Sequence, residues 1–485
     1  MKMTYPAQRA YRLSTLTTAG IIAAMILYSL LIGFAVADNR QSILLALMAI
    51  PVVILGCVFS VRYFVLLVLL LPFMAWSVPL DIPTGTASHV PISMAVCAVL
   101  TGIWVVSMCF RGWSVAPSPF NRPLLVLTAV MFLSLIWSTL WRDPLVVDRT
   151  GKFIVTQLGS LGSYVLSFTA ALLIGNFVDT PRRLKYIVGT FIVCGALTAF
   201  GKLIGHPFFF LHGMGLWALW MNAPIYALVL THPNLSRWLR LVLTGLLLMT
   251  LYLVILVQSH WLSGWTPSVV ALFSITLLHS RRLFAIVVIV AALGYFTPPV
   301  QHFFQETQQA KLEEGDGNRL DIWQHALSVV QPHWFLGTGV AGYALYYMTY
   351  TPDEGLASHN NYVDIVAQFG IVGVCAWLWL AVTILYEGWR LIQRLPPGFL
   401  RSMAIAATGG WMGAQYAMVQ GDWVLPFAYT QGIVGYKYTV FSWMFLGILI
   451  CVRRMLEKQA AEAQAAETIS VAPAEESPPP AVQPA

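Results

Sequence analysis

The sequence predicts an all-α polytopic membrane protein, and two features of its composition lead to this prediction. Hydrophobic residues make up 58% of the 485 residues and charged residues only 10%, whereas soluble proteins carry about 25% charged residues. The mean hydropathy is +0.73. These values exclude a soluble enzyme, a disordered chain and a collagen-like fibre, and the long unbroken apolar runs differ from the alternating pattern of a transmembrane β-barrel.

Apolar runs of the length that crosses a bilayer, about 20 residues, recur along the chain. Because several runs are short, we expect about 12 to 14 transmembrane helices. The candidate spans are 19–37, 43–60, 63–79, 91–110, 123–141, 157–178, 187–205, 213–230, 241–257, 266–279, 283–297, 362–385, 402–420 and 433–451. The first run exceeds the apolar core of a secretory signal, about 7 to 15 residues, so we expect it to persist as a helix.

The positive charges predict the orientation of these helices. With the N-terminus inside, about 19 of the 27 Lys and Arg residues fall on the cytoplasmic side, which is the asymmetry of the positive-inside rule. An even number of spans returns the C-terminus to the same side. The sequence therefore predicts a multi-pass protein with both termini in the cytoplasm.

The chain divides into four expected parts. Residues 1–297 carry the N-terminal transmembrane helices, 298–361 form a long loop outside the cytoplasm, and 362–452 carry the last helices. Residues 453–485 are expected to form a disordered cytoplasmic tail, since much of this segment is Ala, Glu and Pro without periodicity. The loop is too long for a simple connection, so functional residues are expected in it.

The long loop has a charge and a pattern of its own. It holds seven of the chain's 20 acidic residues but only two cations, Lys311 and Arg319. Turn residues 316–318 predict the start of an amphipathic helix that continues to Val330. The three glycines within 337–342 predict a tight backbone turn beside another segment or a ligand. A second short helix is expected over 340–350.

Four short motifs follow one another here: Arg319-x3-Trp323, Leu336-Gly337-x-Gly339, His359-Asn360-x-Tyr362 and Gly370-x2-Gly373. In this order and spacing they resemble the C-terminal signature of the O-antigen ligase and polymerase family. The close resemblance covers residues 315–380, and the many-helix layout with a late outside loop extends it over most of the chain. It implies a glycosyltransferase of the bacterial inner membrane that takes its glycan from an undecaprenyl-pyrophosphate carrier at the periplasmic face.

The resemblance gives the catalytic roles to Arg319 and His359, and their chemistry suits these roles. Arg presents a planar fork of donors that fits the oxygens of a pyrophosphate leaving group. A neutral His can accept the proton of an attacking sugar hydroxyl. Substrate contacts are expected from Asn360, Tyr362 and Asp364. The resemblance further implies an inverting transfer that needs no metal and no cofactor.

A second positive charge is harder to place. Family members often carry a Ser-Arg pair after the helix near 241–257, whereas this chain has Ser259 followed by His260. His260, Lys202 and Lys152 are the candidates that we expect to contact the pyrophosphate in place of that arginine. Arg149 and Lys437 are alternatives on the same predicted side.

Each candidate also has a plain structural interpretation. His359 can be a helix-capping residue, His260 an interfacial hydrogen-bonding residue, and Arg319 a solvated charge that pairs with a neighbouring carboxylate. Asp364 either orients His359 or pairs with a cation, or it lies in the headgroup zone, and the same alternatives are open for Asp422. The histidines of the loop lack the spacing of metal ligands, so no metal site is expected.

Several functions fit these observations. The first is ligation of an O-antigen to lipid A-core in lipopolysaccharide biosynthesis; the second is polymerisation of O-antigen or exopolysaccharide repeat units. A third is a lipid-linked glycan transporter or flippase, which would be expected to carry charges along the membrane interior and internal repeats. A peptidoglycan-polymerising enzyme has a similar helical layout but lacks the His-Asn motif. The expected partners are the carrier-linked glycan, the acceptor and the bilayer, with no nucleic acid.

Overall fold

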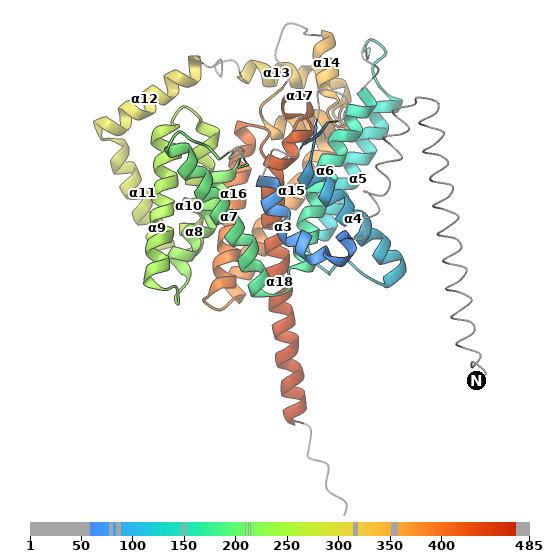
Figure 1. Ribbon diagram of the computed structural model, residues 1–485. Helices are drawn as coiled ribbons and strands as arrows, with labels where there is room; N and C mark the ends of the chain where they lie inside the picture. The colour runs from blue at the N-terminus through green and yellow to red at the C-terminus, as the bar shows by residue number, and fades with distance from the viewer. Residues whose placement is uncertain are drawn as a thin grey trace, which may run out of the picture. The chain divides into compact units, whose positions relative to one another are not determined.

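The computed structural model describes residues 59–76, 81–83, 89–146, 148, 151, 153–208, 210–211, 213, 215–313, 319–350 and 357–471. From Val65 onward the chain forms one compact unit. Within the described residues this unit consists almost entirely of helices (Figure 1). The protein is an all-α polytopic membrane protein, as the composition predicts.

Helices coincide with every expected span between residues 63 and 451. They are α3 (Phe64–Trp76), α4 (Ile92–Arg111), α5 (Asn121–Leu140), α6 (Phe153–Phe177), α7 (Pro181–Leu203), α8 (Trp217–Thr231), α9 (Arg237–Leu251) with its π-helical extension η1 (Tyr252–Val257), α10 (Leu262–His279), α11 (Arg281–Tyr295), α15 (Asn361–Arg394), α16 (Phe399–Gln420) and α18 (Tyr436–Val471). The expected spans 19–37 and 43–60 lie outside the described residues, apart from the last two positions of the second.

Eight helices in the described part of the chain are long and apolar enough to cross a membrane, and a ninth is possible if α11 and α12 (Pro298–Glu313), bent by 80°, form one span. Two more, α3 and α8, are apolar but shorter. The helices begin where the sequence supplies caps: the side chains of Thr180, Ser236 and Ser280 accept hydrogen bonds from the first turns of α7, α9 and α11.

Three features differ from the sequence-based expectations. A short antiparallel hairpin pairs β1 (Asp81–Pro83) with β2 (His89–Pro91). Helix α12 occupies the first part of the long loop. The expected disordered tail is helical as far as Val471, because its Ala, Glu, Gln and Lys residues favour helix and pairs such as Arg453–Glu457 (2.8 Å) form one turn apart.

The long loop carries α13 (Arg319–Val330), a 3-10 turn η3 (Gln331–His333) and α14 (Tyr343–Tyr350). Both expected loop helices are therefore present, the second beginning three residues later than expected. Together with α17 (Ala428–Gln431) they lie at one end of the helical bundle, while α18 extends from the other end (Figure 1). Of the candidate site residues, Arg319 begins α13, while His359 and Asn360 lie in the turn before α15 and Tyr362 and Asp364 lie in its first turn.

A break in α15 receives the glycine-rich segment of the loop. Gly370 has φ 62° inside this helix, a conformation that glycine adopts without the steric cost of a side chain. The backbone groups freed by the break pair with the loop: Thr338 N donates to Ala367 O (2.9 Å) and Ile371 N donates to Trp334 O (2.9 Å). A Cβ on Gly337 would lie 2.3 Å from the backbone of Gln368. The expected tight turn thus packs against the protein's own helix.

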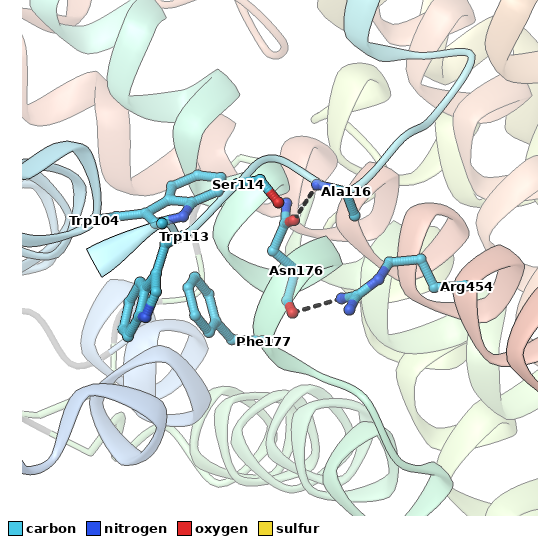
Figure 2. A pocket seen from close by; sticks show the side chains of 8 residues that line it. Trp104, Trp113, Ser114, Ala116, Asn176, Phe177 and Arg454 are labelled. Carbon is cyan, nitrogen blue, oxygen red and sulfur yellow. Dashed lines mark hydrogen bonds between the residues drawn. The ribbon is translucent and has the colours of Figure 1, made fainter. Parts of the chain in front are cut away.

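The opposite end of the bundle has a cavity of about 310 Å³ (Figure 2). It is lined by aromatic side chains, Asn176 and Arg454. Arg454 Nη1 donates to the carbonyl oxygens of Gly175 (2.8 Å) and Asn176 at the end of α6, and Asn176 Oδ1 accepts from Ala116 N (2.7 Å). These hydrogen bonds pair the last carbonyl groups of α6, so Arg454 and Asn176 already have partners within the protein.

Candidate active site

Arg319 begins α13 and reaches the end of α16. Its Nη1 donates to the carbonyl oxygen of Gln420, the last residue of α16, over 3.2 Å. Its positive charge also acts on the carboxyl group of Asp422, two residues further. The first turn of α13 therefore presents a guanidinium group to the segment that follows α16.

His359 lies in the short turn that precedes α15. Its side chain is exposed and its φ is 49°, which is an uncommon conformation for a non-glycine residue and occurs often at functional sites. The next residue, Asn360, caps α15 by accepting hydrogen bonds from Tyr362 N and Val363 N. The structure thus assigns the capping role to Asn360 and leaves the His359 side chain on the surface.

One hydrogen bond connects the Arg319 helix with the His359 turn. Trp323 Nε1, one helical turn after Arg319, donates to the carbonyl oxygen of Ser358 over 2.8 Å. Trp323 also packs beside the buried cluster of Ala326, Tyr347 and Val363, which joins α13, α14 and α15. The first and third sequence motifs therefore meet in space.

Behind the turn lie two buried carboxyl groups, on Asp364 and Asp422, which are 1% and 2% exposed. Asp364 Oδ1 accepts from Tyr343 Oη (2.6 Å) and from Ser358 Oγ (2.7 Å). Asn361 fixes the segment after α16 against α15, because its Oδ1 accepts from both Val424 N and Leu425 N at 3.1 Å. This arrangement brings Asp422 next to Asp364.

Burial and the neighbouring charge of Asp364 raise the pKa of Asp422 well above its usual range, and the positive charge of Arg319 opposes this increase. Burial and both carboxyl groups also raise the pKa of Tyr343, so this phenol keeps its proton and donates a hydrogen bond to Asp364. The acids behind His359 thus form a polar network inside the protein.

Two comparisons with known proteins bear on this chain. Residues 214–378 match a family model, Wzy_C, described as O-Antigen ligase. Residues 214–378 are therefore similar to the O-antigen ligase family. The matched segment contains all four motifs, including Arg319 and His359. No curated protein matches the chain.

The O-antigen ligase domain supports glycan transfer of the ligase or polymerase type in general, and hence a glycosyltransferase-type enzyme in a membrane with lipid-linked glycan substrates. The resemblance that the motifs indicate is confirmed. Asp422 and Lys202 lie outside the matched segment, so the structure, and not the match, connects these two residues to the domain.

Tyr362, in the first turn of α15, points to α16. Its hydroxyl donates to Gln415, whose carbonyl oxygen is 3.1 Å and whose Oε1 is 2.9 Å away. Gln420, one turn after Tyr416 on the same helix, accepts from Thr266 Oγ1 over 2.8 Å. The last turns of α16 therefore contact α15 through Gln415 and α10 through Gln420, and the carbonyl group of Gln420 also binds Arg319.

Two of the described candidates for the second cation, Lys202 and His260, lie near Trp261, the first in space and the second in sequence. His260 is exposed in the turn before α10, and Trp261 follows it. Lys202 Nζ, at the end of α7, lies 5.9 Å from the ring centre of Trp261 and 5.3 Å from that of Trp217, and donates to Gly213 O over 3.0 Å. Trp261 in turn contacts Trp423, with 6.0 Å between ring centres, and so connects Lys202 and His260 to the residue beside Asp422.

The other candidates differ in position. Lys152 and Arg149 lie outside the described residues. Lys437 is 4% exposed and forms an ion pair with Asp81 over 3.1 Å, so its charge is matched within the protein. Among the described residues, no group of three or more His, Cys, Asp or Glu side chains is placed to hold a metal ion.

Sequence reasoning missed several residues of this network. Ser358 could have been suspected, because a serine two residues before an Asn cap is a typical turn residue. Tyr343, Trp423 and Gln420 gave no signal, since each acts through a contact with a residue far away in the sequence.

Proposed function

We propose that this protein transfers a glycan from an undecaprenyl-pyrophosphate carrier to an acceptor hydroxyl at the periplasmic face of the bacterial inner membrane. We further propose an inverting, metal-independent reaction, with lipid A-core as the acceptor and the polymerisation of repeat units as the alternative. The observation that carries this proposal is the connection of Arg319 and His359 through Trp323 and Ser358 inside the O-antigen ligase domain.

In the proposed reaction His359 acts as the general base. Its exposed imidazole accepts the proton of the acceptor hydroxyl while that oxygen attacks the anomeric carbon of the donor sugar. The bond between the anomeric carbon and the pyrophosphate oxygen breaks, and undecaprenyl pyrophosphate leaves from the opposite face of the sugar. Attack opposite to the leaving group inverts the anomeric configuration.

Arg319 is proposed to bind the pyrophosphate, where negative charge develops as the bond breaks. Its guanidinium has further donors besides the one that contacts Gln420 O. Lys202 and His260, the two cations near Trp261, are proposed to supply the second positive charge on the pyrophosphate. Lys152, which the sequence also indicates, stays a proposal without structural support.

Asn360, Tyr362 and Asp364 were expected to contact the substrate. The Asn360 side chain caps α15, Tyr362 bonds α16, and Asp364 is buried with donors from the protein. We therefore propose that these three residues fix the position of His359, and that the polar groups of Gln415 and Gln420 in the last turns of α16 border the acceptor. An orientation with both termini in the cytoplasm places this end of the bundle at the periplasmic face.

The test uses purified protein in nanodiscs, a carrier-linked glycan and an acceptor. Formation of a new glycosidic linkage together with free undecaprenyl pyrophosphate is expected for the wild type and not for His359→Ala. A lipid A-core product supports the ligase and a lengthened carrier-linked chain supports the polymerase. Movement of the lipid-linked glycan across the bilayer without any new linkage would instead support a flippase.

A further inference from the structure

Two acids from different parts of the chain form one buried pair. Asp364 belongs to the first turn of α15 and Asp422 to the segment after α16. Both are almost fully buried, at 1% and 2% exposure. Two adjacent carboxylates cannot both remain ionised in such surroundings, because each charge lacks hydration and repels the other. One of the two groups must therefore hold a proton.

The hydrogen-bond donors around Asp364 indicate that it is the ionised member. Tyr343 Oη and Ser358 Oγ donate to its Oδ1 over 2.6 and 2.7 Å, and Asn361 Nδ2 approaches its Oδ2 at 3.4 Å. The Tyr343 hydroxyl itself accepts from Ser358 N over 3.2 Å, and its O–H is directed to Asp364 Oδ1. A carboxylate that receives donors on both oxygens is stabilised in its charged form.

The surroundings of Asp422 indicate the neutral form. Its Oδ2 accepts from Thr430 Oγ1 over 2.9 Å. No N–H or hydroxyl group of the described residues donates to its Oδ1. The neighbouring carboxylate of Asp364 has room for one more donor, because its two oxygens offer about four acceptor positions and three donors approach them. A proton on Asp422 Oδ1 supplies that donor, and the raised pKa of Asp422 agrees with this assignment.

We propose that Asp422 is a neutral carboxylic acid at neutral pH and that its O–H donates a hydrogen bond to the Asp364 carboxylate. Asp364 holds the His359 turn through Ser358, and Asp422 follows the carbonyl group of Gln420 that binds Arg319. The shared proton therefore joins the two catalytic elements. Both acids are positioning residues. Their effect on catalysis rests on the proposed function, whereas the protonation itself does not.

The proton assignment predicts an asymmetry between two isosteric variants. Asp422→Asn keeps a donor toward Asp364, because its Nδ2–H replaces the carboxylic proton. Asp364→Asn turns an N–H group toward donors that need an acceptor. We expect Asp364→Asn and Asp422→Ala each to reduce kcat/KM by at least about 10-fold. We expect Asp422→Asn, in contrast, to keep kcat/KM within about 3-fold of the wild type. Asp179→Asn, an exposed acid that pairs with Arg183, is the matched control.

Infrared spectroscopy tests the protonation without any transfer assay. The wild type at pH 7 is expected to show the C=O band of a buried carboxylic acid, which shifts in D₂O and disappears in Asp422→Asn. The charged and titratable groups around the pair are Arg319, Tyr343, Tyr164 and, beside Ser358, His359. None of these gives a carboxylic C=O band.

Four results would overturn the proposal: the absence of this band in the wild type, its persistence in Asp422→Asn, equal losses of activity in a well-folded Asp422→Asn and Asp364→Asn, or destabilisation by a chelator. A marked fall in melting temperature on addition of a chelator would mean that two carboxylates share a bound cation instead of a proton. If the band behaves as expected but the wild type makes no glycosidic linkage, the proposed function fails and the proton assignment stands.

Discussion

Replacing Trp323 with Phe removes one hydrogen bond and keeps an aromatic ring in place. The lost bond runs from Trp323 Nε1 to the carbonyl oxygen of Ser358 over 2.8 Å, and Ser358 is 1% exposed. A buried acceptor without a donor costs about 1 to 3 kcal/mol. If this energy holds α13 against the His359 turn during the reaction, kcat/KM falls by about 5- to 150-fold.

The assay for Trp323→Phe is glycan transfer by purified protein, with the melting temperature measured on the same samples. Trp389→Phe is the matched control, because Trp389 is half exposed on a distant part of α15, and it is expected to keep wild-type kcat/KM. A folded Trp323→Phe protein with wild-type activity would refute the reasoning. The double variant Trp323→Phe/Arg319→Lys tests whether Trp323 acts through Arg319. If the two residues act as a unit, the loss of kcat/KM in the double variant is smaller than the sum of the two single losses.

The remaining predictions concern charge, backbone and pH. Arg319→Ala is expected to abolish transfer and Arg319→Lys to retain a fraction of it, since Lys keeps the charge but not the bidentate fork; kinetic assays of both measure this. Gly370→Ala is expected to cost at least about 1 kcal/mol and to lower the melting temperature, because its φ is positive and a Cβ would lie 2.3 Å from the carbonyl oxygen of Phe335. Gly189→Ala, in a helix with open space around it, is expected to leave the melting temperature unchanged or raise it. The raised pKa of Asp422 means that the native state holds one more proton than the unfolded chain above the ordinary value of about 3.9, so stability falls as pH rises from there to the raised pKa; melting curves of Asp422→Asn are expected to lack this decrease.

The membrane helices could be predicted because each depends on local composition. An apolar run long enough to cross a bilayer identifies a helix whatever packs against it. The run 157–178 was predicted in this way and corresponds to α6 in the structure. Helix α16 shows the limit of this criterion: it is well buried but does not qualify as a candidate span, since its glycines, Thr and Gln lower its apolar character. The helical part of the expected tail was missed because a solvent-exposed helix has no apolar face to recognise.

The candidate site could be predicted only in part. The motifs with Arg319 and His359 were recognisable because their spacing lies within one segment of the chain. The pairing of Asp364 with Asp422, and the contact of Trp261 with Trp423, join residues from different helices. No periodicity in the sequence encodes such contacts, so the sequence could name the two aspartates without pairing them and gave no reason to name Trp423.

The central claim is that His359 is the base of a glycan transfer, and one genetic measurement tests it most directly. The gene is deleted in its host and restored as wild type or as His359→Ala, and surface and carrier-linked glycans are compared on gels with protein levels measured in parallel. We predict that His359→Ala accumulates to the wild-type level but leaves full-length polymer on the carrier, as expected for a ligase. A normal surface glycan made by well-expressed His359→Ala would contradict the claim.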